Sequence, residues 1–422
     1  MISDRMNNPF VDFNEKSSFL TGNLSDLGGS FIPESLPHRE EQILQMAKLL
    51  GSLMRNGRPS NIVVYGRTGT GKTSTTRHVM RMLTDATNGY VRICYINCQI
   101  NDSQYSVLVT LVNLFSADSE ENIPLSGWPL DRIYSELVSR IKRSSRPLLV
   151  VLDEIDRMIA KSGSDSLYVI LKLGDDVDGQ SCSIIGITND TSFSERLDSR
   201  VRSRLNQESM LLPPYNASEL KDILSYRTKG ILREGSLEES ALNLCAAIAA
   251  REHGDARKAL DLLRVAIDIT IRNSSLVITD KEVIAARERL EIDILRETVK
   301  SLPLHTQIVL LSCVVTQEVT RRPSFTGEIS RNYSEICQEL GNSPLSNRRV
   351  SDLISDLDDI GLISTRIQSM GRNGRSKLIQ LEENGDQLKK YLMEVDSLSS
   401  FVGAGLGKQS RLNLGNDNDP AN

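Results

Sequence analysis

The sequence predicts an α/β domain built on a parallel sheet, then an all-helical domain, then a smaller unit that ends in a β-hairpin. Short apolar runs alternate with helical patterns from residue 38 to about 212. The strand signal disappears after Pro213-Pro214, and a helix followed by two short strands fits residues 345–381. The predicted boundaries are 1–30 for a flexible N-terminal arm, 31–214, 215–291 and 292–395 for the three domains, and 396–422 for a disordered tail.

Composition indicates an ordinary soluble chain of two or three domains. It has 422 residues, of which 39% are hydrophobic and 25% charged, with a formal net charge of −5. A DNA-binding surface would therefore depend on local clusters of Arg and Lys. The six cysteines include no C-x-x-C pair, which disfavours a zinc site or a disulfide framework. Without an apolar stretch of about 18 residues or an N-terminal signal core, we expect no membrane segment.

Five strands are expected in the first domain, with helical patterns between them. Apolar residues recur at helical spacing in 107–115 and 133–141. Strands that alternate with helices favour a parallel sheet covered on both faces. The strand candidates are 61–65, 92–97, 148–152, 183–188 and 210–212.

The first strand leads directly into a phosphate-binding loop. Residues 66–73 read Gly-Arg-Thr-Gly-Thr-Gly-Lys-Thr, which matches the spacing G-x-x-x-x-G-K-[ST] between a strand and a helix. Glycines allow backbone N–H groups to face phosphates at a helix N-terminus. Lys72 would reach the β- and γ-phosphates, and the Thr73 hydroxyl would bind Mg²⁺. The expected nucleotide contacts are Gly69, Thr70, Gly71, Lys72, Thr73 and Ser74.

The apolar strand candidate 148–152 is followed directly by two acids, Asp153 and Glu154. Asp153 would hold Mg²⁺ through water, and Glu154 would orient and activate the attacking water. Acids after a buried strand are common in α/β proteins, so they point to ATP hydrolysis only together with the phosphate loop.

Two further polar stretches follow in the first domain. Asn189 could contact the γ-phosphate or the water, or it could simply cap the next helix. Arg200, Arg202 and Arg204 are spaced two apart. One of them could act as an arginine finger on a neighbouring subunit, and the alternative is a basic surface helix.

In the helical domain, Arg257 follows Gly254-Asp255-Ala256 at the start of a helix. It could fold over the γ-phosphate, or it could be an ordinary helix-start arginine. Tyr215 and Arg227 flank the first helix of this domain. Tyr215 could stack on adenine, although a core tyrosine is the alternative.

Residues 345–381 have the pattern of a winged helix. Ser346 is a plausible cap for a helix with an apolar stripe, and Gly361 ends that helix. The helix N-terminus would enter the major groove, and the hairpin would follow the adjacent minor groove or backbone. Winged helices also bind proteins, and a basic hairpin tip is compatible with simple solvation. The expected DNA contacts are Arg348, Arg349, Arg366, Arg372, Arg375 and Lys377.

The order of these motifs resembles the archaeal-type origin-recognition initiators, relatives of the eukaryotic origin recognition complex large subunit and the cell division control loader. The resemblance covers about residues 30–385 and rests on many motifs in the same order. The segment 31–43 resembles the adenine-side segment of the family. Besides this segment and the phosphate loop, the matching motifs are 152–156, 188–190, 197–205, 213–215, 254–257 and 348–353.

The resemblance implies an AAA+ doubly wound parallel sheet with an all-helical lid domain, followed by a winged-helix DNA-binding domain. It gives Asn189 and Arg257 the two nucleotide-sensor roles and makes Tyr215 and Arg227 further nucleotide contacts. It also implies ATP/ADP and Mg²⁺ as cofactors. The region after Asn97 would hold an insertion that lies against DNA. The resemblance does not decide which of Arg200, Arg202 and Arg204 is the arginine finger.

The function implied is that of an ATP-dependent DNA replication initiator, acting in the cytoplasm on the nucleoid. It would bind double-stranded origin DNA, recruit or load the replicative minichromosome maintenance helicase, and hydrolyse ATP slowly as a conformational switch. Self-association, or assembly with a paralogue on DNA, is possible. The alternatives are a remodelling motor, such as a clamp loader or unfoldase subunit, and a transcription-regulating ATPase with a DNA-binding tail. The first has no need of the basic winged helix, and the second should lack the segment 31–43.

Overall fold

The chain divides into two structural units between Arg287 and Glu288. Among the described residues, no helix combines the length and the apolar character that crossing a bilayer requires. The computed structural model describes residues 17–29, 31–55, 57–116, 122–177, 180–205, 207–369 and 375–399, without the side chains of Ser369 and Arg375.

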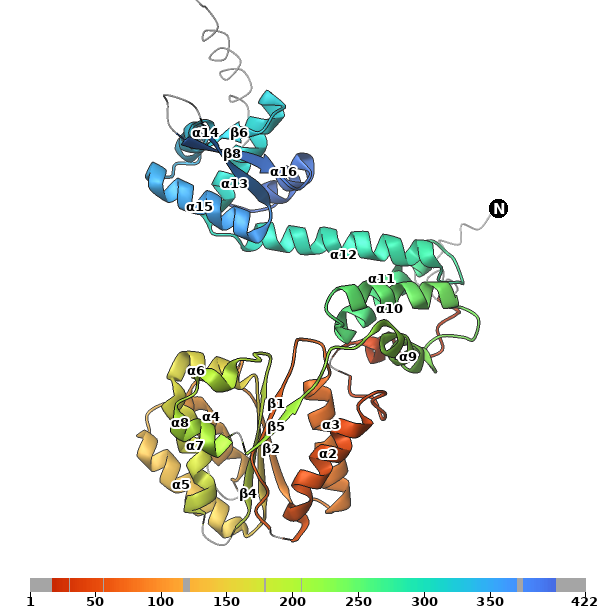
Figure 1. Cartoon of the computed structure of the whole chain (residues 1–422), viewed down its shortest axis with the longest axis vertical. Helices are drawn as coiled ribbons and strands as arrows, with labels where there is room; N and C mark the ends of the chain where they lie inside the picture. The colour runs from red at the N-terminus through yellow and green to blue at the C-terminus, as the bar shows by residue number, and fades with distance from the viewer. Residues whose placement is uncertain are drawn as a thin grey trace, which may run out of the picture. The chain divides into compact units, whose positions relative to one another are not determined.

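A five-stranded parallel sheet forms the centre of the first unit, with the strand order β2-β3-β4-β1-β5 (Figure 1). Every residue of β3 and β4 is buried, as expected for strands covered on both faces. The predicted parallel sheet is therefore confirmed. The strands are β1 (Ile62–Tyr65), β2 (Arg92–Asn97), β3 (Leu148–Asp153), β4 (Cys182–Thr188) and β5 (Glu208–Leu211).

Helices cover both faces of this sheet (Figure 1). On one face lie α2 (Glu40–Leu50) and α3 (Lys72–Ala86), packed on Leu149 and Val151 of β3. Leu148, Val150 and Leu152 point to the other face, because side chains alternate along a strand. That face is covered by α4 (Gln104–Leu114), α5 (Leu130–Ser144), α6 (Ile155–Ser162), α7 (Ser164–Asp176) and α8 (Ser199–Leu205).

The helical domain follows β5 within the same unit. A capping box between Asn216 and Glu219 begins its first helix. Its helices are α9 (Ala217–Thr228), α10 (Glu239–Arg251) and α11 (Ala256–Arg272). A long helix, α12 (Asp280–Ser301), begins here and ends in the second unit.

Residues 17–29 differ from the expected flexible arm, because they pack on the helical domain. Leu20 forms an antiparallel bridge with Leu232, and Leu27 lies buried in a short 3₁₀ helix, η1 (Leu24–Leu27). Phe19 is also buried. This stretch is mostly polar, so its composition does not indicate that a few apolar side chains pack it on the helical domain. The rest of the predicted arm, 1–16 and residue 30, lies outside the described residues.

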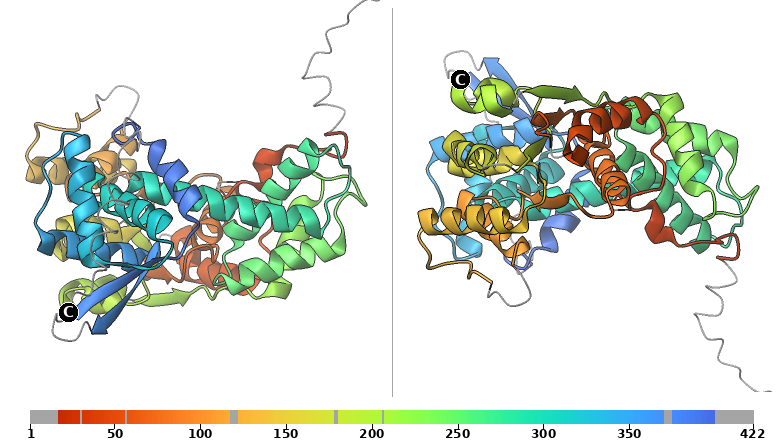
Figure 2. Two further views of the ribbon diagram at one scale, coloured as in Figure 1. Left: turned by 90° about the horizontal axis from the view of Figure 1, so that it is seen from above. Right: turned by 90° about the horizontal axis from the view of Figure 1, so that it is seen from below.

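The second unit has the element order of a winged helix: helix, strand, two helices and a two-stranded hairpin, with one more helix after it. Its antiparallel sheet has the order β6-β8-β7, and the β7–β8 hairpin projects beside the helices (Figures 1 and 2). The elements are α13 (Leu304–Thr320), β6 (Ser324–Phe325), α14 (Thr326–Glu339), α15 (Asn347–Ile360), β7 (Ile363–Ser369), β8 (Arg375–Leu381) and α16 (Gly385–Met393).

The core of the second unit is built around α13, whose residues 306–316 are all buried. It extends to Leu398, which is fully buried. The tail predicted from residue 396 therefore begins too early, because this apolar side chain joins the core. The remaining part of the tail prediction, 400–422, lies outside the described residues.

Candidate nucleotide site and nucleic-acid interface

The phosphate loop has the backbone conformation that its glycines permit. β1 ends at Tyr65, and α3 begins at Lys72. Gly69 and Gly71 have φ angles of 74° and 86°, in the left-handed region that disfavours other residues. The loop therefore turns its backbone toward the N-terminus of α3, where anions are favoured.

The helical domain contacts this loop at Gly69. The Ala256 N–H donates to the Gly69 carbonyl at 3.2 Å. A Cβ atom at Gly69 would lie only 1.7 Å from Oδ1 of Asp255. Asp255 caps α11 by accepting hydrogen bonds from the N–H groups of Arg257 and Lys258. Sequence reasoning did not single out Asp255, although an Asp directly before a helix is a typical cap.

Lys72 lies buried beneath the loop. Its Nζ donates to the carbonyl oxygens of Gly66 and Arg67, at 2.8 and 2.7 Å. Burial, followed by the positive charge of Arg257, lowers the pKa of Lys72 to about 8. Burial and the charge of Arg257 destabilise the ammonium form of Lys72, and a nearby anion would stabilise it. The residues present therefore fit a phosphate group.

Asp153, at the end of β3, accepts three hydrogen bonds. Its Oδ2 accepts from the Thr73 hydroxyl at 2.9 Å and from the Tyr95 hydroxyl at 2.5 Å. Its Oδ1 accepts from the Glu154 N–H at 3.0 Å. Burial raises the pKa of Tyr95, and the hydrogen bond to Asp153 adds to this effect. Tyr95 was not among the predicted site residues.

Thr73 and Asp153 supply the hard oxygen ligands that Mg²⁺ prefers. In the described part of the chain, no group of three or more His, Cys, Asp or Glu side chains could hold a metal ion. A Mg²⁺ ion here would therefore depend on phosphates and water for its other ligands, which is its usual behaviour at nucleotide sites.

The predicted site residues come together in two adjoining hollows beside the loop. Gly69, Gly71, Thr73 and Arg257 line both of them. The first is also lined by Lys72, Asp153, Glu154 and Asn189. The second is also lined by Phe31, Ser74, Tyr215, Tyr226 and Arg227. The roles of these side chains toward a nucleotide stay predictions.

Glu154 has a φ angle of 55°, which is uncommon for a residue with a side chain. Such strained residues gather at functional sites.

Tyr215 and Arg227 make contacts of their own at the second hollow. Tyr215 is buried, and the guanidinium of Arg39 lies 3.8 Å from its ring centre. Arg227 donates to the carbonyls of Asp26 and Gly28, and burial lowers its pKa. Arg227 thus also fixes the N-terminal segment at the rim of the hollow.

Arg39 is a residue that sequence reasoning missed. Its guanidinium donates to the Thr70 carbonyl from Nε and Nη2, at 3.1 and 3.0 Å, and to the Pro213 carbonyl at 2.7 Å. It therefore connects the phosphate loop with the segment that leads to the helical domain. The available signal was Arg39 at the start of the charged run Arg39-Glu40-Glu41, within the family-like segment 31–43.

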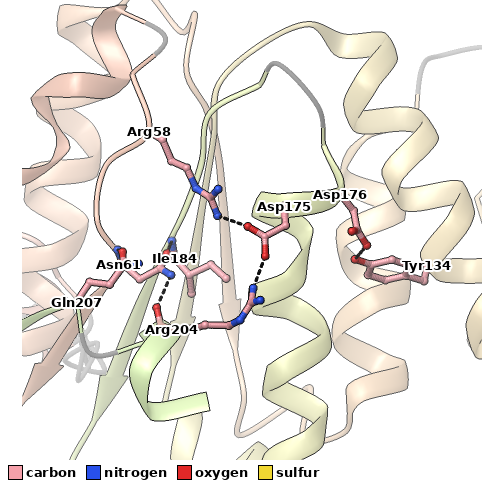
Figure 3. Close-up of polar contacts among 8 residues, drawn as sticks. All are labelled: Arg58, Asn61, Tyr134, Asp175, Asp176, Ile184, Arg204 and Gln207. Carbon is pink, nitrogen blue, oxygen red and sulfur yellow. Dashed lines mark hydrogen bonds and ion pairs between the residues drawn. The ribbon is translucent and has the colours of Figure 1, made fainter. Parts of the chain in front are cut away.

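The three arginines of α8 are not equivalent. Arg204 donates to Asp175, which also accepts from Arg58 at 2.9 Å (Figure 3). Arg200 is exposed, and it lies 3.2 Å from Asp198 and 3.6 Å from Asp165 of α7. Arg202 is exposed, and within the described residues it forms no ion pair. Arg204 therefore holds α8 on α7 through Asp175. Arg200 makes a longer and more exposed ion pair with Asp165 of α7, and Arg202 faces solvent.

The winged helix exposes part of the predicted DNA surface. Arg348 and Arg349 are exposed in the first turn of α15, which Ser346 caps, and Arg366 is exposed on β7. Lys377 differs from the expected hairpin tip, because it lies within β8 opposite Ile367 and donates to the Ser355 hydroxyl at 2.7 Å. Arg372 and the side chain of Arg375 lie outside the described residues.

The helix that the resemblance places near DNA is α4. Its apolar residues Val107, Leu108, Leu111 and Val112 are fully buried in the core of the first unit. The following residues 117–121 lie outside the described part of the chain.

Comparisons with known proteins agree with this arrangement. Three family models match: "AAA ATPase domain" over 35–185, "Cdc6 AAA+ ATPase-type lid domain" over 221–288 and "CDC6, C terminal winged helix domain" over 297–391. The chain is 52% identical to an ORC1-type DNA replication protein of Picrophilus torridus, covering 98% of this chain and 100% of that one. It is 51% identical to ORC1-type DNA replication protein 2 of Thermoplasma acidophilum, covering 96% and 99%.

Among solved structures, the chain resembles the Aeropyrum pernix ORC1 protein in complex with DNA. The two are 35% identical with a TM-score of 0.75, over 90% of this chain and 98% of that one. Cdc6p from Pyrobaculum aerophilum is 25% identical with a TM-score of 0.58, over 89% and 99%.

Proposed function

Since the chain belongs to the ORC1/Cdc6 family of DNA replication initiators, we propose that it binds double-stranded origin DNA and recruits or loads the replicative minichromosome maintenance helicase. ATP binding and slow hydrolysis act as a conformational switch. The protein works in the cytoplasm on the nucleoid, with a second copy or a paralogue beside it on the DNA. The family resemblance motivates these finer assignments.

One observation carries the proposal: side chains of both domains of the first unit line the hollow at the phosphate loop. Lys72, Asp153, Glu154 and Asn189 come from the sheet domain, and Arg257 comes from the helical domain. A triphosphate bound by both groups favours one arrangement of the two domains over others. The helical domain continues through α12 into the winged-helix unit.

Each side chain has a role in this scheme. Lys72 and the loop N–H groups bind phosphate oxygens, and Glu154 orients the attacking water and accepts its proton. Asn189 and Arg257 contact the γ-phosphate and thereby distinguish ATP from ADP. Thr73 and Asp153 hold Mg²⁺, which when bound supplies positive charge to the phosphates.

The test is recovery and sequencing of genomic DNA fragments bound by the protein, followed by fluorescence anisotropy on one recovered fragment with ATP or ADP. An initiator should enrich one inverted-repeat locus or the region beside its own gene, and its affinity should depend on the nucleotide. Enrichment at many promoters would instead favour a transcription regulator. Equal affinity with ATP and ADP would contradict the switch.

We further propose that Arg200 or Arg202, and not Arg204, supplies an arginine finger to a neighbouring copy on DNA. Replacement of the finger by Ala should lower the assembly-dependent rate of ATP hydrolysis by a factor on the order of 10³. Arg204→Ala should mainly lower the melting temperature, because Arg204 holds Asp175. Hydrolysis measured against protein concentration on DNA separates these effects. Loss of assembly-dependent hydrolysis in Arg204→Ala alone would reject this assignment.

A further inference from the structure

We propose that Tyr95 is a positioning residue for the magnesium site: its hydroxyl fixes the orientation of the Asp153 carboxylate. This inference rests on the proposed nucleotide function and extends it to a residue outside the phosphate loop and its two acids.

The strand register places the two side chains together. β2 and β3 are parallel neighbours, with Asn97 opposite Asp153 and Tyr95 opposite Val151. Tyr95 and Asp153 both project toward α3, because side chains alternate along each strand. The distance of 2.5 Å between the Tyr95 hydroxyl and Oδ2 of Asp153 is typical of a hydrogen bond to a charged acceptor.

The hydrogen bonds at Asp153 leave it little freedom. An ionised carboxylate has about four lone-pair positions, and three of them accept hydrogen bonds from Thr73, Tyr95 and the Glu154 N–H. The remaining position is available for a metal-bound water. Rotation of a carboxylate about its last torsion is otherwise soft. Of the three donors, Thr73 must also bind the metal ion. The hydrogen bond from Tyr95 therefore holds the Asp153 carboxylate in place whether or not the metal is bound.

Tyr95 is itself held from α3. The guanidinium of Arg77 lies 4.1 Å from the centre of the Tyr95 ring. Arg77 is one helical turn after Thr73, so α3 presents both side chains on one face. One helix thus contacts Asp153 directly and secures the tyrosine that orients it.

Tyr95→Phe tests this role, because it keeps the ring and its contact with Arg77 and removes only the hydroxyl. We expect the Mg²⁺ concentration for half-maximal ATP hydrolysis to rise by up to roughly 10-fold, the lower end of the effect seen when a direct ligand loses its supporting contact, because Asp153 contacts the metal through water. Electron paramagnetic resonance with Mn²⁺ and ADP should show weaker metal binding by a similar factor. Nucleotide affinity in EDTA should stay at the wild-type value.

A matched control is Tyr134→Phe. The Tyr134 hydroxyl donates to Asp176 at 2.7 Å (Figure 3), from a helix on the opposite face of the sheet. Both variants lose one Tyr–Asp hydrogen bond, so both should lose similar stability in a thermal melt. Only Tyr95→Phe should alter the metal dependence.

A double-mutant cycle with Asp153→Asn completes the test. If Tyr95 acts through Asp153, Tyr95→Phe should have no further effect on metal binding in the Asp153→Asn background. A wild-type Mn²⁺ binding curve for Tyr95→Phe would overturn the inference. Absence of metal-dependent nucleotide binding in the wild-type protein would instead overturn the proposed function on which the inference rests.

Discussion

Glu154→Gln is expected to keep ATP bound while ATP hydrolysis falls by a factor of about 10²–10⁴, the usual contribution of a general base. The amide has nearly the shape of the carboxylate, but it accepts a proton far less readily. Glutamine should also tolerate the left-handed backbone of this position as well as glutamate does, because the two side chains branch alike. The variant therefore separates nucleotide binding from chemistry.

The structure supports this separation. Glu154 touches the Asp153 carboxylate through its backbone N–H, which Gln retains. The contacts of Lys72 and Thr73 do not involve the Glu154 side chain. Single-turnover phosphate release and a filter-binding measurement of retained ATP are the two readouts. Lys72→Ala provides the opposite comparison, because it should lose the nucleotide itself. Phosphate release at the wild-type rate in Glu154→Gln would refute the role assigned to Glu154.

Much of the fold could be predicted because its signals are local. β3 and β4 are buried along their whole length, so they appear in the sequence as continuous apolar runs. The phosphate loop combines a strand, fixed glycine spacing and a helix start within 12 residues, 62–73. In the winged helix, the Ser346 cap and the left-handed Gly361 that ends α15 are local signals too.

Contacts between distant segments could not be predicted in this way. Asp255 meets Gly69, and Arg39 meets both Thr70 and Pro213, across long stretches of chain. Tyr95 looked like an ordinary strand residue, because its partner Asp153 comes from a neighbouring strand. A local pattern gives the residue type and its periodicity, and it contains no information about which distant group lies opposite. For the same reason, the sequence does not distinguish the three arginines of α8. The structure does, because Asp175 accepts a hydrogen bond from Arg204.

Arg348→Ala combined with Arg349→Ala is expected to weaken origin DNA binding by roughly 30-fold to 10⁴-fold, since each base-contacting arginine contributes about 1–3 kcal/mol and 1.4 kcal/mol corresponds to a factor of ten. Both side chains are exposed in the first turn of α15, so their removal should cost little stability. Nucleotide affinity should be unchanged, because the described residues that line the proposed nucleotide site all belong to the first unit. Anisotropy titrations with origin and random duplexes measure the effect.

The salt dependence of binding tells which part of the DNA the two arginines contact. If they bind phosphates, the double variant should lose affinity for both duplexes equally, and the slope of log K against log[salt] should fall by about 0.9 for each lost contact. If they read bases, the preference for origin DNA should fall while binding to random DNA persists. Lys389→Ala with Lys390→Ala on α16 removes the same charge from the same unit and serves as the control. An undiminished preference for origin DNA, with binding no weaker than in this control, would exclude the N-terminus of α15 as the reading element.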